Sequence, residues 1–293
     1  MELQGKIQET FEHFTPASSP EEIDKIVEGI IARRYKAAYT IETLRFLFST
    51  IDLTTLAGAD TKESVQKLVE LVNHTASHPE EGLPNVAAVC VYPLQVSVVK
   101  EFMKADGVRI AAVSGGFPAS QTFLEIKLAE TALTVAAGAD EIDIVLNLNH
   151  FLPGNYSAVV EEIEEQKAAC RSAHLKVILE TGLLKDPELV RKASILSLYS
   201  GADFIKTSTG KEYPGADLRA AYTMCCALRD YRKETGLLRG IKFSGGIRSA
   251  EDAVKYYCIV EEILGAEWMT NKLFRIGASS LAGNLIKAIS ECK

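Results

Sequence analysis

Short runs of apolar and β-branched residues alternate along the chain with longer amphipathic stretches, beginning near residue 48. The short runs have the length of buried strands, and the stretches between them repeat apolar positions with the helical period. We therefore predict eight strands separated by helices. The predicted strands are residues 48–53, 86–92, 108–113, 141–146, 175–180, 203–208, 240–243 and 273–277, and clear helices are residues 63–73, 121–137, 156–172 and 217–233.

The stretch 121–137 illustrates the helical pattern. Its apolar residues at helical spacing are Phe123, Ile126, Leu128, Ala129 and Leu133. The charged residues Glu125, Lys127 and Glu130 lie opposite them. Such a pattern predicts a helix that buries its apolar face and exposes its charges.

Eight strands that each precede a helix, with no long linker rich in Pro or Ser, indicate a closed (β/α)8 TIM barrel. The alternative is an open doubly wound sheet, in which a Gly-x-Gly-x-x-Gly turn should follow the first strand. No such turn follows residues 48–53. We expect residues 1–47 to form extra helices, over residues 20–34 and 40–48, packed on a catalytic barrel of residues 48–293.

Composition and charge exclude several classes of protein. The chain has 293 residues, 47% hydrophobic and 24% charged, and a barrel of roughly 250 residues is typical. A net charge of −7 gives no basic surface for nucleic acid or an anionic membrane. No signal-like or membrane-spanning run is present, and the six cysteines lack a CxxC spacing. We therefore expect a cytoplasmic protein with reduced thiols.

Two lysines interrupt predicted apolar strands. Lys206 lies in the run ADFIKTSTGK (residues 202–211) and Lys242 in GIKFSGGIR (residues 240–248). An ammonium group is rarely buried without a partner, so each lysine needs a reason to be there. At about 4 Å and an effective dielectric near 20, two cations repel by roughly 4 kcal/mol. That repulsion favours loss of a proton, and a neutral lysine is a nucleophile toward carbonyls.

Polar residues near the ends of other predicted strands are expected to face the same site, because barrel active sites lie at the carboxyl ends of strands. These residues are Asp52 on the first strand, Cys90 on the second and Asp143 on the fourth. Two lysines and two carboxylates in one pocket suit Schiff-base chemistry, in which a carboxylate moves protons. The alternative is that the aspartates cap helices or form structural ion pairs with the lysines.

Gly-rich loops follow the last strands. GGIRS (residues 245–249) and GASS (residues 277–280) each lead into a helix, where backbone N–H groups can bind an anion. Thr209, Gly210 and Lys211 add a hydroxyl and a cation, although Glu212 excludes a Walker A loop. Each loop taken alone could be a simple turn. Two of them in the usual phosphate-binding location of a barrel predict a phosphate site.

No metal site is predicted, because His74 and His78 are better explained as a helix end.

Together these motifs resemble those of the deoxyribose-phosphate aldolases, a family of class I, Schiff-base aldolases. The similarity extends from about Asp52 to Ser280 and includes the runs DLT (52–54), AVCVYP (88–93), GADEIDIV (138–145), LKVILETG (175–182), FIKTSTGK (204–211) and FRIGASS (274–280). The family often has Pro or Ala after the lysine of the seventh strand, where this chain has Phe243. Phe243 is therefore expected to reshape the wall of the site.

The resemblance implies that Lys206 forms the Schiff base, that Lys242 lowers its pKa and that Asp143 relays protons with a bound water. Asp52 is implied to contact a substrate hydroxyl. The other residues expected to bind substrate are Cys90, Thr209, Gly210, Lys211, Gly245, Gly246, Gly277, Ser279 and Ser280.

The implied reaction is the reversible cleavage of 2-deoxy-D-ribose 5-phosphate to D-glyceraldehyde 3-phosphate and acetaldehyde, in deoxyribonucleoside catabolism. The iminium ion serves as electron sink, so no metal or organic cofactor is expected. The implied partner is a small sugar phosphate, not nucleic acid or a membrane, and self-association is left open. The alternatives are another Schiff-base aldolase or transaldolase and a non-catalytic sugar-phosphate-binding barrel. A metal-dependent aldolase is disfavoured, because no histidine falls at a strand end.

Overall fold

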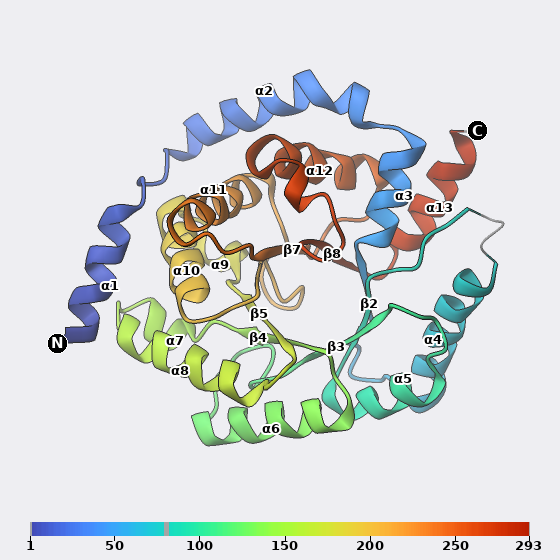
Figure 1. Ribbon diagram of the computed structural model, residues 1–293, viewed down its shortest axis with the longest axis horizontal. Coiled ribbons are helices and arrows are strands. Elements are labelled where there is room, and N and C mark those ends of the chain that lie inside the picture. The colour runs from blue at the N-terminus through green and yellow to red at the C-terminus, as the bar shows by residue number, and fades with distance from the viewer. Residues whose placement is uncertain (1, 79–81, 293) are drawn as a thin grey trace.

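A closed barrel of eight parallel strands, paired in chain order, forms the centre of the molecule (Figure 1). The computed structural model describes residues 2–78 and 82–292. The strands are β1 (Ile51–Thr54), β2 (Ala88–Val91), β3 (Arg109–Val113), β4 (Glu141–Val145), β5 (His174–Ile178), β6 (Phe204–Lys206), β7 (Gly240–Ser244) and β8 (Phe274–Ala278). The predicted (β/α)8 TIM barrel is confirmed. The strands begin and end within two residues of their predicted bounds, except that β1 starts three residues later, because helix α3 (Ile41–Ser49) occupies the positions before it.

Helices cover the outside of the barrel. They are α4 (Lys62–Ser77), η2 (Pro93–Gln95), α5 (Val96–Phe102), α6 (Leu124–Ala137), α7 (Leu148–Phe151), α8 (Tyr156–Ala169), α9 (Thr181–Leu184), α10 (Pro187–Tyr199), α11 (Leu218–Thr235), α12 (Ala250–Leu264), η3 (Ala266–Trp268) and α13 (Leu281–Glu291). Within the described ranges, none of the helices combines the length and the hydrophobicity needed to cross a membrane.

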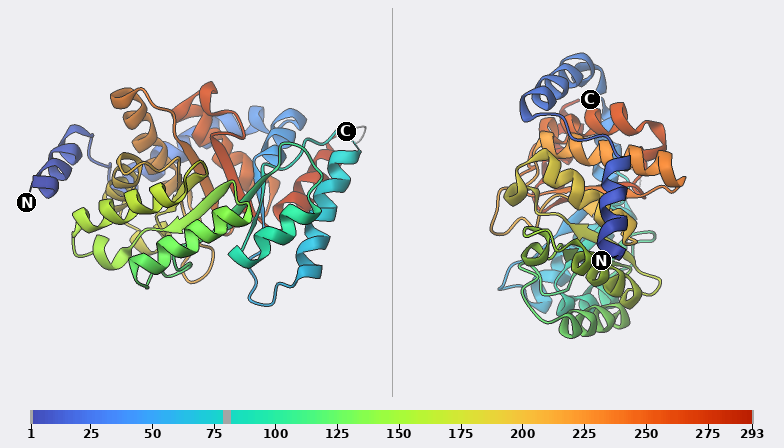
Figure 2. Two further views of the ribbon diagram at one scale, coloured as in Figure 1. Left: turned by 60° about the horizontal axis from the view of Figure 1, so that its bottom comes forward. Right: turned by 90° about the vertical axis from the view of Figure 1, so that its left-hand side faces the viewer.

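Three helices precede the barrel: α1 (Glu2–His13), α2 (Pro20–Ala38) and α3 (Ile41–Ser49). Helix α2 runs across α11 and α12, α3 packs beside α13, and α1 packs on α8 and α10 (Figure 1). Ser19 starts α2 with a capping box, because its hydroxyl accepts from the N–H of Glu22 and the Glu22 carboxylate accepts from the N–H of Ser19. Helices α1 and α13 lie on opposite sides of the barrel (Figure 2). Helix α1 was not predicted.

Side chains along each strand alternate between the barrel interior and the layer beneath the helices. On β7, Lys242 points inward to Asp143, whereas Phe243 points outward and packs against the rings of Tyr256 and Phe274, with centroids 4.8 and 5.8 Å away. Phe243 is therefore a core residue between strand and helix. The expectation that it reshapes the wall of the site is wrong, because the strand period turns it away from the interior.

Helix α6 buries the face that its pattern was expected to expose. Lys127 is fully buried, and its ammonium donates to the Ser120 hydroxyl at 2.8 Å and to Glu162 at 2.6 Å. Ile126 and Leu133 instead remain 57% and 71% exposed. The predicted orientation is wrong because the helix has apolar residues on both sides, so the buried ion pair with α8 decides which side faces the barrel.

Candidate active site

Seven charged side chains, which we call the charged cluster, lie inside the barrel. They are Asp52, Glu141, Asp143, Lys176, Lys206, Lys242 and Arg275. Each is at most 5% exposed. The interior of a parallel barrel is usually filled by branched apolar side chains. Because buried charges are costly unless they are paired, this composition indicates chemistry or a specific network, and the geometry shows which groups are paired.

Asp143 is the centre of the charged cluster. Its Oδ2 accepts hydrogen bonds from the ammonium groups of Lys206 at 3.0 Å and Lys242 at 2.9 Å, and its Oδ1 accepts from Lys176 at 2.8 Å. The two lysines that share one oxygen therefore have nitrogens no more than about 6 Å apart, close enough for direct repulsion. Lys206, Lys242 and Asp143, which were predicted to lie close together, are in direct contact.

The remaining carboxylates each contact at least two cations. Asp52 lies 2.6 Å from the Lys242 nitrogen and accepts a hydrogen bond from Arg275 at 2.6 Å. Glu141 lies 2.6 Å from the Lys176 nitrogen and accepts from Arg275 at 2.9 Å. Each buried carboxylate is thus compensated, and Arg275 joins the two ends of the network.

The pKa values in the charged cluster diverge. Burial is the largest influence on the pKa of Lys206 and lowers it; the Lys242 charge adds to this, although Asp143 opposes it. Burial also acts against the charge on Lys242, but Asp143 and Asp52 outweigh it and hold the pKa of Lys242 well above its usual value. Burial disfavours the anionic form of Asp143, yet the three lysines keep its pKa well below the ordinary range.

Lys206 is therefore the amine that loses its proton most readily. The charged cluster holds four cations against three carboxylates, so a neutral Lys206 leaves three charges of each sign. From the sequence, Lys242 is expected to lower the pKa of Lys206. The structure adds burial as the larger cause, with Lys242 acting in the same direction.

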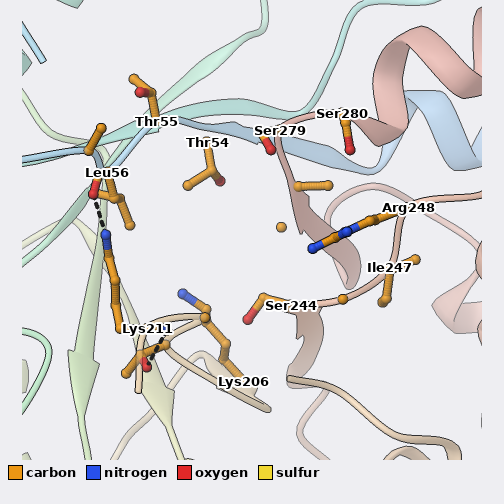
Figure 3. A pocket seen from close by; sticks show the side chains of 17 residues that line it. Thr54, Thr55, Leu56, Lys206, Lys211, Ser244, Ile247, Arg248, Ser279 and Ser280 are labelled. Carbon is orange, nitrogen blue, oxygen red and sulfur yellow. Dashed lines mark hydrogen bonds between the residues drawn. The ribbon is translucent and has the colours of Figure 1, made fainter. Parts of the chain in front are cut away.

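A cavity of about 440 Å³ opens above Lys206 at the carboxyl ends of the strands. The Lys206 amine points into it, as Figure 3 shows. Nine of the predicted residues line this cavity: Lys206, Thr209, Gly210, Lys211, Gly245, Gly246, Gly277, Ser279 and Ser280. Of the seven cluster residues, all in the described part of the chain, Lys206 alone lines the cavity.

Asp52 and Cys90 lie behind the cavity wall instead of in it. The oxygens of Asp52 are held by Lys242 and Arg275, so the geometry favours positioning of Lys242 over contact with a substrate hydroxyl. Cys90 is fully buried among small apolar residues, where burial raises the pKa of its thiol. Neither residue lines the cavity, because each lies before the end of its strand; on β1 it is Thr54, two residues after Asp52, that reaches the cavity wall.

The cavity wall is positively charged. Among the described residues that line it are Lys206, Lys211 and Arg248, with no carboxylate. The Lys211 ammonium donates to the Leu56 carbonyl and lies 5.8 Å from the centre of the Tyr92 ring. Arg248 reaches into the cavity from the loop after β7 (Figure 3). In a chain of net charge −7, this local excess of cations favours an anionic ligand.

Backbone N–H groups add to the positive character of the cavity wall. Ser279 and Ser280 stand at the start of α13, where N–H groups have no partner within the helix. Gly245 has φ +81°, and a Cβ at the neighbouring Gly215 would lie 2.1 Å from the Gly245 carbonyl oxygen. The loops after β6 and β7 can approach this closely because both residues are glycine.

Several charged residues of the site were not predicted from the sequence. Lys176 interrupts an apolar strand in the same way as Lys206 and Lys242, and Arg275 does so on β8, so the signal was available. Glu141 gave a weaker signal, because it lies at the beginning of β4 next to Asp140. Arg248 belonged to a loop already assigned to phosphate but was not selected.

Glu180 is another residue that spacing did not reveal. It follows β5 with φ +56°, an uncommon conformation for a residue other than glycine, and is 3% exposed. Its carboxylate accepts from the Thr209 N–H at 3.2 Å and the Thr209 hydroxyl at 2.6 Å. The Thr209 hydroxyl in turn accepts from the N–H of Lys211 at 3.2 Å. Glu180 thus fixes the loop that carries Lys211.

A parallel barrel with a readily deprotonated lysine beneath a cationic cavity defines the class of barrel aldolases. Comparison with known proteins agrees with this class. A family model described as DeoC/LacD family aldolase matches residues 46–278, which include all eight strands. The chain belongs to this family.

Individual relatives are similar over most of their length. The chain is 41% identical over 270 residues to a deoxyribose-phosphate aldolase of Homo sapiens, covering 88% of this chain and 83% of that protein. It is 41% identical over 273 residues to the deoxyribose-phosphate aldolase of Mus musculus, with the same coverage. The solved structure of deoxyribose phosphate aldolase from Aeropyrum pernix, described as tetrameric, is similar with a TM-score of 0.67 and 26% identity, and the match covers 94% of this chain and 100% of that chain.

Proposed function

We propose that this protein catalyses the reversible aldol cleavage of 2-deoxy-D-ribose 5-phosphate to D-glyceraldehyde 3-phosphate and acetaldehyde, in deoxyribonucleoside catabolism. Relatives that are 41% identical over most of both chains are deoxyribose-phosphate aldolases. The observation in this chain that carries the proposal is the position of Lys206. Its amine reaches the cavity from a buried position that lowers its pKa, next to cations that suit a phosphate.

The chemistry begins with the neutral Lys206 amine. It attacks the aldehyde carbon of the open-chain sugar, and loss of water gives an iminium ion. The hydroxyl on C3 then loses its proton and the C2–C3 bond breaks, which releases D-glyceraldehyde 3-phosphate. The bonding electrons move into the iminium and give an enamine. Protonation of the enamine at C2 and addition of water release acetaldehyde and restore the amine. The iminium takes up the electron pair, so the mechanism uses no metal or organic cofactor.

Asp143 and Lys242 are proposed to handle the protons near this amine. Asp143 Oδ2 is hydrogen-bonded to both lysines, so it provides a short path by which a proton can leave Lys206. Asp52 and Arg275 hold Lys242 in place from the other side. Lys242 and Asp143 lie behind Lys206 relative to the cavity, which suits a role in setting its protonation.

The phosphate group is assigned to the upper part of the cavity. Lys211, Arg248, Ser279 and Ser280 face this space from the loops after β6, β7 and β8 (Figure 3). Charge-assisted hydrogen bonds from such groups would anchor the phosphate. The carbonyl end of the sugar would then lie toward Lys206 at the bottom of the cavity.

We also make proposals on the location of the enzyme in the cell, its domain boundaries and its self-association. We infer a cytoplasmic location from cysteines that lack the spacing of a disulfide framework. We assign catalysis to residues 48–293, with residues 1–47 as a helical extension. We also propose self-association, because the related Aeropyrum pernix enzyme is described as tetrameric.

Borohydride trapping tests the proposal. Reduction in the presence of acetaldehyde should leave an ethyl group on the peptide that contains Lys206, and Lys206→Met should abolish both the label and turnover of the sugar phosphate. Circular dichroism should show that the variant is folded. A label on Lys211 or Lys242 would contradict the assignment. A wild-type protein that binds the sugar phosphate without labelling or turnover would be a non-catalytic binder.

A further inference from the structure

Glu180 combines a costly backbone conformation with a buried charge. It lies between β5 and α9 with φ +56°, a region that residues other than glycine rarely adopt. Two backbone hydrogen bonds of 2.9 Å hold the turn around it: the Thr181 N–H donates to the Thr207 carbonyl, and the Leu183 N–H donates to the Glu180 carbonyl. Glycine would adopt this turn without strain. Because the chain has glutamate here instead, the outlier points to a function for the carboxylate.

The Glu180 carboxylate is compensated differently from those of the charged cluster, which contact cations directly. Of the residues that the structure describes, Thr209 alone is hydrogen-bonded to it, through its N–H at 3.2 Å and its hydroxyl at 2.6 Å. Burial is the largest influence on the pKa of Glu180 and raises it, and the two hydrogen bonds from Thr209 oppose this. A buried carboxylate is costly, so what it does for Thr209 explains its presence.

The carboxylate sets the direction of the Thr209 hydroxyl. An ionised carboxylate only accepts hydrogen bonds, so the hydroxyl must donate to Glu180. A lone pair of the same oxygen is then left for the N–H of Lys211, at 3.2 Å. An amide at position 180 could not replace the carboxylate. Its NH2 group would face either the N–H of Thr209, which is also a donor, or the hydroxyl, which would then have to reverse.

Thr209 has open space on two sides, so these hydrogen bonds hold it more than packing does. It lines the active-site cavity of about 440 Å³ and also a second hollow of about 370 Å³. Glu180 lines the second hollow but not the cavity, so it reaches the cavity through Thr209. Gly210, with φ +73°, brings no side chain to restrain the loop. Without the carboxylate, the loop that carries Thr209 and Lys211 should therefore shift.

We propose that Glu180 is a positioning residue for phosphate binding, which acts on the ligand through Thr209 and Lys211. The inference rests on the proposed function and names the residue that sets its preference for a phosphorylated sugar. The Lys211 ammonium donates to the Leu56 carbonyl and lies 5.8 Å from the centre of the Tyr92 ring (Figure 3). These contacts hold the far end of the Lys211 side chain, whereas Glu180 holds its backbone end.

Kinetics with and without the phosphate test the assignment. Glu180→Gln should raise KM for 2-deoxy-D-ribose 5-phosphate about 10-fold or more and change kcat by less than about 3-fold. KM for 2-deoxyribose and the borohydride labelling with acetaldehyde should not change, because Asp143 holds Lys206 from below the cavity. Glu188→Gln on α10 is the matched control. Its carboxylate also accepts from a backbone N–H, that of Ala17 at 3.0 Å, but does not line the cavity, and KM should keep the wild-type value.

A double-mutant cycle tests the route from Glu180 to the phosphate. If Glu180 acts through Lys211, Glu180→Gln should raise the KM of Lys211→Met less than about 2-fold further. Effects that multiply in full would overturn the proposal. Should circular dichroism show that Glu180→Gln is unfolded, Thr209→Val removes the hydroxyl alone. It should raise KM for the sugar phosphate in the wild type but not in Lys211→Met, and an unchanged KM in the wild type would contradict the proposal.

The pattern of losses separates the alternatives. Equal losses with the two sugars would indicate a general structural role for Glu180. A loss of kcat at unchanged KM would indicate that it transfers a proton. Either result would refute a positioning role.

Titration with inorganic phosphate separates this inference from the proposed function. Phosphate should raise the Tm of the wild type, and Glu180→Gln should need a concentration about 10-fold higher for the same shift. If the wild type shows this difference but does not cleave the sugar phosphate, the aldolase assignment fails and the positioning role stands. If the wild type cleaves the sugar and Glu180→Gln changes neither KM nor the phosphate titration, the positioning role fails and the aldolase assignment stands.

Discussion

Replacing Lys242 by methionine gives a direct test of how the charged cluster prepares Lys206. The change keeps most of the length of the side chain and removes its charge. It removes a cation near Lys206 and leaves Asp143 Oδ2 with a single lysine of the original two. Both effects stabilise the protonated amine, so the pKa of Lys206 should rise and less neutral amine should be present at neutral pH.

The size of the effect follows from the geometry. Both nitrogens lie within 3.0 Å of the same Asp143 oxygen. At a separation of about 5 Å and an effective dielectric of about 20, their repulsion is roughly 3 kcal/mol, or about two orders of magnitude in the neutral fraction of Lys206. The variant should still fold, because Asp52 retains its hydrogen bond from Arg275 and Asp143 retains its hydrogen bond from Lys176.

The assay is kcat/KM for the sugar phosphate as a function of pH. Lys242→Met should lose about 100-fold near pH 7, and the loss should shrink as the pH approaches the ordinary pKa of a lysine, roughly 10.4. Lys242→Arg, which keeps a positive charge, is the control and should show a loss that does not vary with pH. A constant loss for Lys242→Met between about pH 7 and pH 10 would refute the electrostatic role and indicate that Lys242 positions the substrate.

Three further predictions concern the charged cluster and the anion site. Lys176→Met should lower the free energy of unfolding by about 3–5 kcal/mol in denaturant titrations, since Asp143 and Glu141 lose an ion partner; an unchanged midpoint would contradict this. Lys211→Met should raise KM for the phosphorylated sugar about 10-fold or more but leave KM for 2-deoxyribose unchanged, and equal effects on both would exclude a phosphate contact. The pKa values of Asp143 and Glu141 are depressed, so the stability they contribute is present above their ordinary values of 3.8 and 4.5 and is lost as the pH falls below them. Thermal unfolding should therefore shift to lower temperature below about pH 4.5, and Glu141→Gln should reduce the slope.

The barrel was predictable because its signals are local and repeated. Eight apolar runs separated by amphipathic stretches leave few alternatives, and polar residues in those runs mark the interior. Lys206, Lys242 and Asp143 were found in this way, as were the glycine and serine residues of the cavity wall. Lys176 on β5 and Arg275 on β8 carry the same signal, a charged residue inside an apolar strand.

The orientation of individual side chains was less predictable because partners far apart in sequence decide it. Lys127 turns into the protein because its ammonium donates a hydrogen bond to Glu162 on α8. The apolar residues of α6 therefore face outward. Asp52 turns toward Lys242 and Arg275, which follow it by 190 residues or more in the chain. Periodicity describes one helix or strand at a time, so it carries no information on these pairings.

The charged cluster links the stability of the barrel to its chemistry. Four cations and three carboxylates in the buried interior of the barrel leave one positive charge in excess, and the excess is removed when Lys206 loses its proton. The other cations have their pKa values held high by carboxylates that contact them directly. Deprotonation of Lys206 is therefore a property of the whole network. A change at Arg275, which does not line the cavity, should alter the reactivity of Lys206 through Asp52 and Lys242.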